Sequence, residues 1–235
     1  NYRAALTKDV QKGMKDFANK VDKLIKNKNK NILDIGCNDG SLLNFFLKKK
    51  FKTLGIEPTN AYEDCSKNHI IFNEYFTKKT VKKILNENNF IDVVTFTNVF
   101  AHIPDFQELI KNLKLLIPNI NYLVIENHYM GSIFKTDQFD TFYQEHPRTY
   151  SVKSFEFIAK KLGKKLVGVF FPKRYGGNIR VYLSSEDLFL KDISNQNFLN
   201  KTDERYMISE FNKMQTFIDN WKKKTKNSII ELAKQ

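Results

Sequence analysis

One short run in the first third of the chain places an acidic residue and two glycines at spacings that can hold a ligand. It reads Asp-Ile-Gly-Cys-Asn-Asp-Gly, with Asp34, Gly36 and Gly40 as its key positions. Glycines in a strand-to-helix turn let the backbone approach a ligand without an intervening Cβ. A nucleoside triphosphate loop would need Gly-Lys-Ser/Thr, and a dinucleotide loop would need glycines where Asn38 and Ser41 stand. The acidic-x-Gly-x-x-x-Gly spacing instead favours S-adenosylmethionine.

Glu57 adds a second feature to the same site. It closes the second expected strand, about 17 residues after Gly40. A carboxylate there can accept hydrogen bonds from both ribose hydroxyls, and Asp34 would face the ligand's ammonium group, where an opposite charge is favoured. The alternative is a generic α/β turn with a surface glutamate. The residues expected to bind the cofactor are Asp34, Gly36, Asn38, Asp39, Gly40, Glu57 and Asn98.

The elements that must position these residues alternate between short apolar strands and helices, as in βαβ units with a parallel sheet. Strands are expected at 31–35, 53–57, 70–72, 91–97 and 122–126, and helices at 10–24, 41–50, 78–86, 106–117 and 151–162. The alternation pauses between Asn127 and Tyr150. Strands at 165–171 and 179–183, joined by a short Pro- and Gly-containing segment, indicate a terminal antiparallel hairpin. The pattern predicts an α/β, Rossmann-like, seven-stranded and mostly parallel sheet with helices on both faces, typical of class I methyltransferases.

Three parts are expected along the chain. Residues 1–30 would form an N-terminal helix and a polar linker, and residues 31–185 the S-adenosylmethionine-binding domain. Residues 186–235 would form a helical extension, with a long amphipathic helix from about Asp203. We expect that extension to be cut short before a further domain.

Five motifs occur together within residues 2–185. They are Gly36–Gly40, Gly55–Thr59, Asn98–Asp105, Phe139–His146 and Gly176–Tyr182. The run Phe-Asp-Thr-x-Tyr-x-Glu-His within the fourth motif is much rarer than a glycine turn. With these motifs the chain resembles the sugar C-methyltransferases, which act on nucleotide-linked deoxyketosugars.

The resemblance implies a base, because a carbon beside a ketone becomes nucleophilic only after it loses a proton. It implies His146 as that base, since an ordinary histidine pKa of about 6.5 suits the step. Tyr143 and Glu145 would be its partners in the acceptor site, with the carboxylate fixing the tautomer of His146. His102, after the fourth expected strand, is a second candidate, although a loop histidine is the simpler interpretation.

Two residues of the expected hairpin, Asn178 and Arg180, would hold the acceptor or its phosphates. Arg180 alternates with apolar neighbours along a strand, so a solvated outward face is the other interpretation. His69 and His128 receive no role, although His128 lies near the expected ligand crevice.

The resemblance is incomplete in ways that affect the acceptor. The family usually has an N-terminal zinc-binding module and a further C-terminal domain, so the sequence is expected to be a piece of a longer protein or a reduced relative. Tyr175-Gly-Gly-Asn stands where the family commonly has His-Gly-Gly-Ser, and Pro147–Tyr150 stand where it commonly has an aromatic stretch. Methylation of oxygen or nitrogen on a carbohydrate or another small metabolite is therefore the alternative.

Composition leaves another class open. The 235 residues carry 39 basic and 26 acidic side chains, a net charge of +13, which attracts phosphates of any kind. An RNA methyltransferase or RNA-binding module is one alternative, although the Asn-Val-Phe-Ala run from Asn98 is not an Asn/Asp-Pro-Pro-Tyr/Phe motif. The other alternative is a non-catalytic protein that keeps the fold and serves as a structural partner. Two cysteines cannot build a disulfide scaffold or a four-cysteine zinc site. We expect no metal, no membrane association and a cytoplasmic location.

Overall fold

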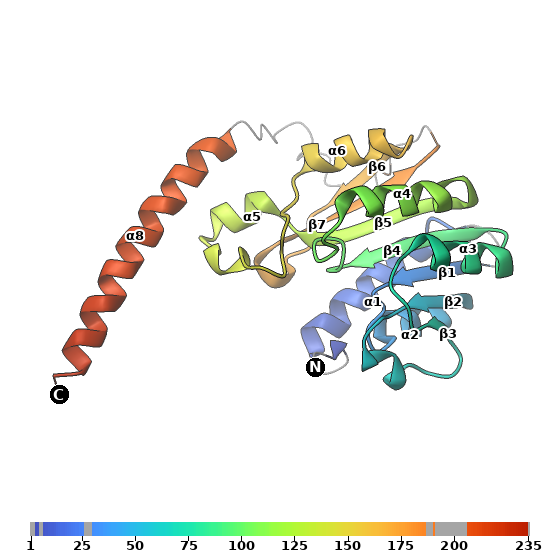
Figure 1. Cartoon of the computed structure of the whole chain (residues 1–235), viewed down its shortest axis with the longest axis horizontal. Helices are drawn as coiled ribbons and strands as arrows, with labels where there is room; N and C mark the ends of the chain where they lie inside the picture. The colour runs from blue at the N-terminus through green and yellow to red at the C-terminus, as the bar shows by residue number, and fades with distance from the viewer. Residues whose placement is uncertain (1–2, 5–6, 26–29, 187–189, 191–205, 235) are drawn as a thin grey trace.

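A seven-stranded sheet forms the centre of the chain in the computed structural model, which describes residues 3–4, 7–25, 30–186, 190 and 206–234 (Figure 1). The strand order is β3-β2-β1-β4-β5-β7-β6. The strands are β1 Lys30–Ile35, β2 Phe51–Ile56, β3 Ile70–Phe72, β4 Ile91–Thr97, β5 Ile120–His128, β6 Lys165–Phe170 and β7 Asn178–Ser184. The expected linker at 26–29 and the expected helix start near Asp203 lie outside the described residues.

The direction of the strands confirms the predicted architecture. The first five strands are parallel, whereas β7 runs antiparallel to both β5 and β6. The β6–β7 hairpin therefore closes one edge of a mostly parallel sheet. In such a sheet the carboxyl ends of the parallel strands meet at one edge, where ligands bind.

Successive side chains of the central strands point into two separate cores, because side chains alternate across a sheet. Leu33 and Val94 belong to one core, and their neighbours Ile32 and Val93 belong to the other. The helices that cover the first face are α3 Lys78–Glu87, α4 Phe106–Leu116 and α6 Val152–Lys161, and those that cover the second are α1 Lys8–Asp22 and α2 Ser41–Leu47. Both faces of the sheet are covered, as predicted.

Polar side chains define where the helices of the first face begin. Asp105 accepts a hydrogen bond at 2.8 Å from the backbone N–H of Glu108 at the start of α4. Ser151 and Ser154 form a reciprocal capping box at the start of α6. These caps satisfy N–H groups that have no partner within the helix. The predicted cap at Ser151 is confirmed.

The segment after β5 contains more structure than the sequence indicates. It forms α5 Met130–Lys135 and the 3-10 helix η4 Phe139–Thr141, both too short to show a helical period. The described residues also form the 3-10 helices η2 Asn60–Asp64, η3 Ile117–Asn119 and η5 Arg174–Gly176. This segment lies beside the carboxyl end of β5, so it can contribute to a site there.

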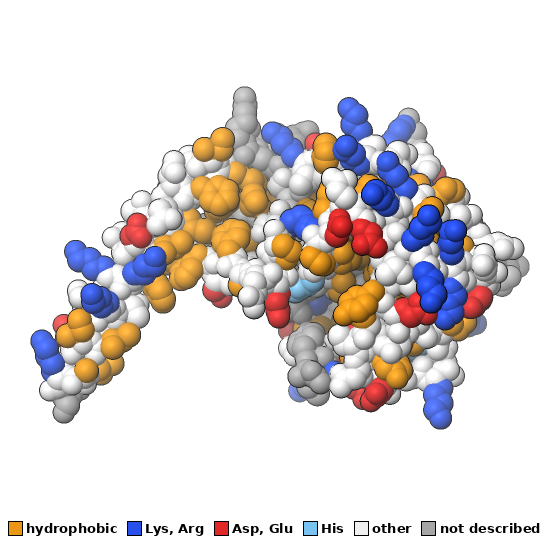
Figure 2. Space-filling model, viewed as in Figure 1, with side chains coloured by type: hydrophobic (Ala, Val, Ile, Leu, Met, Phe, Trp, Pro, Cys, Tyr) orange, Lys and Arg blue, Asp and Glu red, His pale blue; other side chains and the backbone are white. Residues whose placement is uncertain are grey.

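The last helix, α8 Met207–Leu232, extends away from the rest of the chain (Figure 1). Its residues Phe211 and Trp221 pack on the segment after β5, with ring centres 4.7 Å apart for Phe134 and Phe211 and 5.2 Å apart for Phe139 and Trp221. Orange apolar side chains line this junction on the face seen in Figure 2. Helix α8 thus supports the segment that carries candidate site residues.

Candidate active site

A cavity of about 480 Å³ lies at the carboxyl ends of the central strands. Its walls come from the turn after β1, the end of β2, the loop after β4 and the segment after β5. Helix α1 adds Val10 and Met14. The position is that of ligand sites in α/β sheets, and the volume falls within the usual range of about 300–1,000 Å³. The cavity joins the expected cofactor residues to the expected acceptor residues.

The turn after β1 adopts a conformation that explains its glycines. Gly36, Asn38 and Gly40 are all left-handed, with φ of 74°, 52° and 73°. A Cβ on Gly36 would lie 2.5 Å from Cγ2 of Val99, so position 36 requires glycine for both conformation and space. Asp34, Gly36 and Asn38, three of the residues expected to bind the cofactor, border the cavity.

Glu57 borders the cavity and holds the turn in place. Its Oε2 accepts a hydrogen bond at 2.9 Å from the backbone N–H of Asn38. Its Oε1 accepts bonds from the backbone N–H and the hydroxyl of Thr59, at 2.9 and 2.6 Å. A carboxylate offers about four acceptor positions. Oε2 therefore keeps one for a ligand hydroxyl.

Asp34 is buried at the base of the turn. Its Oδ1 accepts a hydrogen bond at 2.6 Å from the hydroxyl of Thr95. Burial raises the pKa of Asp34 to about 7, with a further rise from the charge of Glu57, although the bond from Thr95 acts in the opposite direction. Near neutral pH the carboxyl is thus divided between its charged and neutral forms. A cationic ligand group beside it would favour the charged form.

The other expected cofactor residues occupy different positions. Asp39 accepts a hydrogen bond at 3.0 Å from the backbone N–H of Ser41, and Gly40 is the N-cap of α2, so both shape the start of that helix. Asn98 borders the cavity, and its Oδ1 accepts a bond at 3.2 Å from Nδ2 of Asn178. Asn98 is therefore placed to contact a ligand directly.

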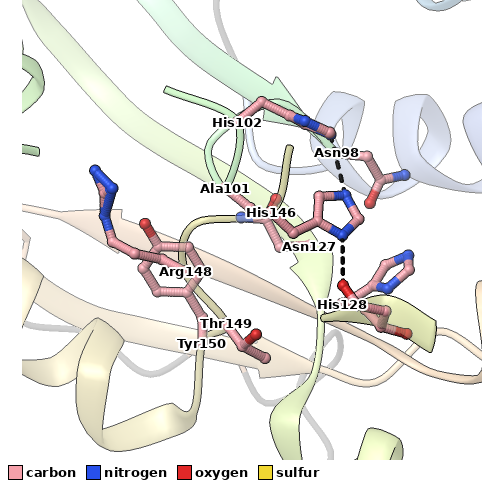
Figure 3. A pocket seen from close by; sticks show the side chains of 10 residues that line it. Asn98, Ala101, His102, Asn127, His128, His146, Arg148, Thr149 and Tyr150 are labelled. Atoms are coloured by element: carbon pink, nitrogen blue, oxygen red, sulfur yellow. Dashed lines mark hydrogen bonds between the residues drawn. The ribbon is translucent and has the colours of Figure 1, made fainter. Parts of the chain in front are cut away.

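Three histidines from three segments converge at the other end of the cavity (Figure 3). His102 follows β4, His128 ends β5, and His146 lies in the segment after η4. The Nε2 atoms of His102 and His146 are 3.2 Å apart, and the ring centres of His128 and His146 are 5.4 Å apart. The hydroxyl of Tyr143 lies 3.4 Å from Nε2 of His146. Both histidines proposed as bases from the sequence thus belong to one cluster.

The hydrogen bonds of His146 assign its tautomer. Its Nδ1 lies 3.1 Å from the carbonyl oxygen of Thr141. A carbonyl oxygen only accepts, so Nδ1 carries the proton and the lone pair of neutral His146 is on Nε2. The ring nitrogen beside this lone pair is Nε2 of His102, 3.2 Å away. The nitrogen of His146 that can take up a proton is therefore the one beside His102 and Tyr143, at the cavity.

The neighbouring histidines are kept neutral. Burial lowers the pKa of both His102 and His128, and a positive charge on His146 would lower both further. A hydrogen bond to the backbone of Glu145 opposes the fall for His102, as the charge of Asp140 does for His128. At neutral pH these two rings therefore add no positive charge next to His146.

Glu145 lies at the cavity but does not orient His146. Its side chain is exposed and borders the cavity wall. The sequence analysis expected this carboxylate to fix the tautomer of His146, but the carbonyl of Thr141 does so. The expectation is wrong because the chain folds back after η4, which brings a backbone acceptor closer to Nδ1 than the neighbouring side chain.

Arg180 is fully buried. Its Nε donates to Oε2 of Glu126 at 2.6 Å, and its Nη1 to Oδ2 of Asp16 at 3.3 Å. Its guanidinium carbon lies 4.5 Å from the ring centre of Phe17. Burial lowers the pKa of Arg180, but the charge of Glu126 outweighs this and the pKa is raised. A solvated outward face is wrong, because α1 supplies Asp16 and Phe17 against this position.

Glu126 also holds the remaining polar groups of the hairpin. Its Oε1 accepts from Nδ2 of Asn178 at 3.1 Å and from Nη1 of Arg174 at 3.3 Å. Asn178 is fully buried and supports Asn98. Arg174 borders the cavity. Asn178 and Arg180, which the sequence analysis expected to hold the acceptor, are instead buried against Glu126 and do not border this cavity. The hairpin residue on the cavity wall is one that the sequence analysis did not select.

Three parts of the cavity wall were not assigned to the site from the sequence. His128 was given no role, yet it ends β5 at the sheet edge where ligands bind, and that position was its signal. Arg174 carried no signal because it lies in an irregular join. Val10 and Met14 looked only like the core face of α1, because the same apolar spacing serves both purposes.

No arrangement of three or more His, Cys, Asp or Glu side chains suited to a metal ion occurs in the described ranges. Among the helices that the structure describes, none has the length and apolar character needed to cross a membrane.

Comparison with known proteins places these features in a family. Residues 4–168 match a family model described as a methyltransferase domain. Over 153 residues the chain is 24% identical to the C-methyltransferase NovU of Streptomyces niveus, covering 64% of this chain and 36% of that protein. Over 100 residues it is 27% identical to a ubiquinone biosynthesis O-methyltransferase of Coxiella burnetii (strain Dugway 5J108-111), covering 41% of this chain and 43% of that protein. The chain thus spans less than half the length of both relatives.

Solved structures share the fold at low sequence identity. A SAM dependent methyltransferase from Archaeoglobus fulgidus aligns with a TM-score of 0.61 and 15% identity, over 74% of this chain and 94% of that chain. Magnesium protoporphyrin IX methyltransferase (ChlM) from Synechocystis PCC 6803, crystallised with bound SAH, aligns with a TM-score of 0.57 and 11% identity, over 75% and 83%. The seven-stranded sheet with its terminal antiparallel hairpin is common to this group of folds.

Proposed function

The chain belongs to the methyltransferase domain family, and we propose that it methylates a carbon atom of a nucleotide-linked deoxyketosugar with S-adenosylmethionine as methyl donor. It is a methyltransferase with the Rossmann-like class I fold. The identity of the acceptor and of the methylated atom is the proposed part. It is supported by the resemblance of the motifs to sugar C-methyltransferases and by the similarity to NovU.

The turn after β1 fits the methyl donor. Glu57 keeps an acceptor position for a ribose hydroxyl, and Asn38 and Asn98 border the same part of the cavity. Asp34 carries the charge that an ammonium group would favour. When bound, S-adenosylmethionine supplies an electrophilic methyl group on a positively charged sulfur.

The observation that carries the proposal is the pairing of this turn with a directed base in one cavity. Nε2 of His146 is available to remove a proton from the carbon beside the acceptor's ketone. Nε2 of His102 lies 3.2 Å from that nitrogen and borders the same cavity. The carbon then becomes nucleophilic and can take the methyl group in line with the sulfur. Tyr143 and Glu145 line the acceptor end of the cavity.

Methylation of oxygen is the second candidate. The same Nε2 could take a proton from a hydroxyl, and the Coxiella burnetii relative is described as an O-methyltransferase. The two reactions differ in what they require of His146, since a hydroxyl is a better nucleophile than a carbon before proton removal.

The experiment that tests the function is the variant His146→Asn, assayed with nucleoside diphosphate deoxyketosugars. Turnover should fall by about 10²–10⁴, while the affinity for S-adenosylhomocysteine stays within about twofold. Exchange of the acceptor's carbon-bound hydrogen with solvent deuterium should fall with turnover. Full turnover in the variant removes His146 from the reaction. A methylated product without any exchangeable carbon position favours methylation of oxygen or nitrogen.

A further inference from the structure

Removal of a proton by His146 creates a negative charge on the acceptor. The electron pair of the broken C–H bond moves into a C=C bond, and the electrons of the C=O bond move onto the oxygen. An enolate oxygen needs a hydrogen-bond donor in a fixed position. That donor must lie beside the histidine cluster, because the carbonyl carbon is bonded to the carbon that loses its proton.

A second, smaller cavity lies at this position. It has a volume of about 30 Å³ and shares Asn98, His102, His128 and His146 with the large cavity. Figure 3 shows its lining, with residues from the loop after β4, from β5, and from η4 and the segment after it around one space. A single oxygen-bearing group occupies a space of about this size.

Asn127 lines this small cavity from the end of β5. It is only 2% exposed, and in the described part of the chain neither Nδ2 nor Oδ1 of its amide has a hydrogen-bond partner. Buried amides are nearly always bonded, because leaving one without a partner is costly. Asn127 therefore differs from Asn112, equally buried in α4, whose Nδ2 donates to the carbonyl of Phe76 at 3.0 Å.

The backbone holds Asn127 rigidly. The residue pairs with Ile179 of β7, and its neighbour His128 pairs with Asn178. The hydroxyl of Tyr150, which also borders this cavity and also lacks a partner in the described residues, points away from the histidines in Figure 3. The hydroxyl of Tyr143 lies at the base itself, 3.4 Å from Nε2 of His146, whereas the amide of Asn127 lines the small cavity and has no partner in the described residues.

We propose that Nδ2 of Asn127 donates a hydrogen bond to the carbonyl oxygen of the acceptor and holds the negative charge that forms there. The inference rests on the proposed carbon methylation. The proton goes to Nε2 of His146, the charge goes to the oxygen bound by Asn127, and the carbon then attacks the methyl group, releasing a neutral thioether. The small cavity would thus take the oxygen of a ketone whose neighbouring carbon carries an acidic hydrogen.

The test compares Asn127→Leu with Asn112→Leu. Leucine has nearly the shape of asparagine but cannot donate a hydrogen bond. For Asn127→Leu, turnover of a nucleoside diphosphate deoxyketosugar should fall by about 10²–10³, the loss typical of one such donor. Deuterium exchange at the acceptor carbon, measured with S-adenosylhomocysteine bound, should fall by a similar factor, and cofactor affinity should not change.

The melting temperature separates this role from a structural one. Asn127→Leu should melt at or above the wild-type temperature, because it removes a buried amide without a partner. Asn112→Leu should melt about 2–6 °C lower, because it leaves a buried carbonyl without its donor, and it should keep wild-type turnover. A fall in melting temperature for Asn127→Leu equal to that for Asn112→Leu would overturn the proposal.

Two further outcomes separate a failure of the oxygen subsite from a failure of the proposed function. If the wild type methylates and exchanges the ketosugar, but Asn127→Leu does so equally well, the oxygen subsite is wrong and the proposed function stands. If the wild type neither methylates nor exchanges any deoxyketosugar tested, the proposed acceptor is wrong and the subsite is overturned with it.

Discussion

His146 is oriented by the backbone, which makes its role depend on the fold of one segment. The carbonyl of Thr141 holds Nδ1, and η4 places that carbonyl. The tautomer of His146 is therefore set by the fold of this segment and not by a neighbouring carboxylate.

Asp34 should make cofactor binding depend on pH. Its pKa of about 7 in the free protein falls when a cationic ammonium group binds, so the complex holds fewer protons than the free protein. The affinity for S-adenosylhomocysteine should thus rise with pH up to about 7 and then level off. Calorimetry between pH 6 and 8 measures this, in buffers of different ionisation enthalpy to detect the released proton. In the variant Asp34→Asn the affinity should no longer depend on pH. The same slope of affinity against pH in the variant and the wild type would contradict this role of Asp34.

Glu57→Ala should weaken binding of S-adenosylhomocysteine by about 10–150-fold, or roughly 1.5–3 kcal/mol. The change removes the ribose acceptor and also releases the backbone N–H of Asn38, which Glu57 holds at 2.9 Å. Glu74→Ala is the matched control, since that partly exposed carboxylate pairs with Lys83 and does not line the cavity. Calorimetry of both variants is the measurement, and equal affinities in the two would rule out this role for Glu57.

At the scale of the elements, β5, β7 and α1 are joined by one buried charge. Glu126 of β5 accepts from Arg180 of β7, which in turn reaches Asp16 of α1. The same carboxylate accepts from Asn178, whose amide supports Asn98 at the cavity. This network sets the position of the loop after β4 relative to the hairpin.

Arg180→Met should destabilise the protein by about 3–5 kcal/mol, because it leaves the fully buried Glu126 without its closest cation. Chemical denaturation followed by circular dichroism measures the change. Lys213→Met is the control and should shift stability by less than about 0.5 kcal/mol, because that lysine is exposed and its ion pair with Glu210 lies on the surface. A loss below about 1 kcal/mol for Arg180→Met would contradict the network's importance.

Periodicity and turn chemistry were enough to predict the sheet, since each strand has a clear apolar run and Ser151 a clear capping pattern. They were not enough for α5, which has under two turns. They also failed for Arg180, because an arginine between apolar residues looks the same whether it faces water or a buried carboxylate. For the site, glycine spacing revealed the turn, but the meeting of His102, His128 and His146 is a tertiary contact without a local signal.

At the scale of the whole molecule, the charge of +13 should not produce selective RNA binding. We expect weak association without sequence preference in a filter-binding assay at about 0.15 M salt, where charges are screened beyond about 8 Å. Lysines are spread over the whole chain, and the cavity has the dimensions of a small-molecule site. Raising the salt should abolish the association. Tight binding with a sequence preference would instead support the RNA class.

Helix α1 is at once a part of the core and a wall of the cavity, through Val10 and Met14. A ligand in the cavity can therefore contact the same side chains that pack α1 against the core. Ligand binding and the docking of α1 are thus coupled. A ligand present at 100 times its Kd adds about 2.7 kcal/mol to the folded state, and part of that gain goes to keeping α1 docked. Limited proteolysis near the amino terminus should therefore slow when S-adenosylhomocysteine is bound, because the ligand and α1 share the wall formed by Val10 and Met14.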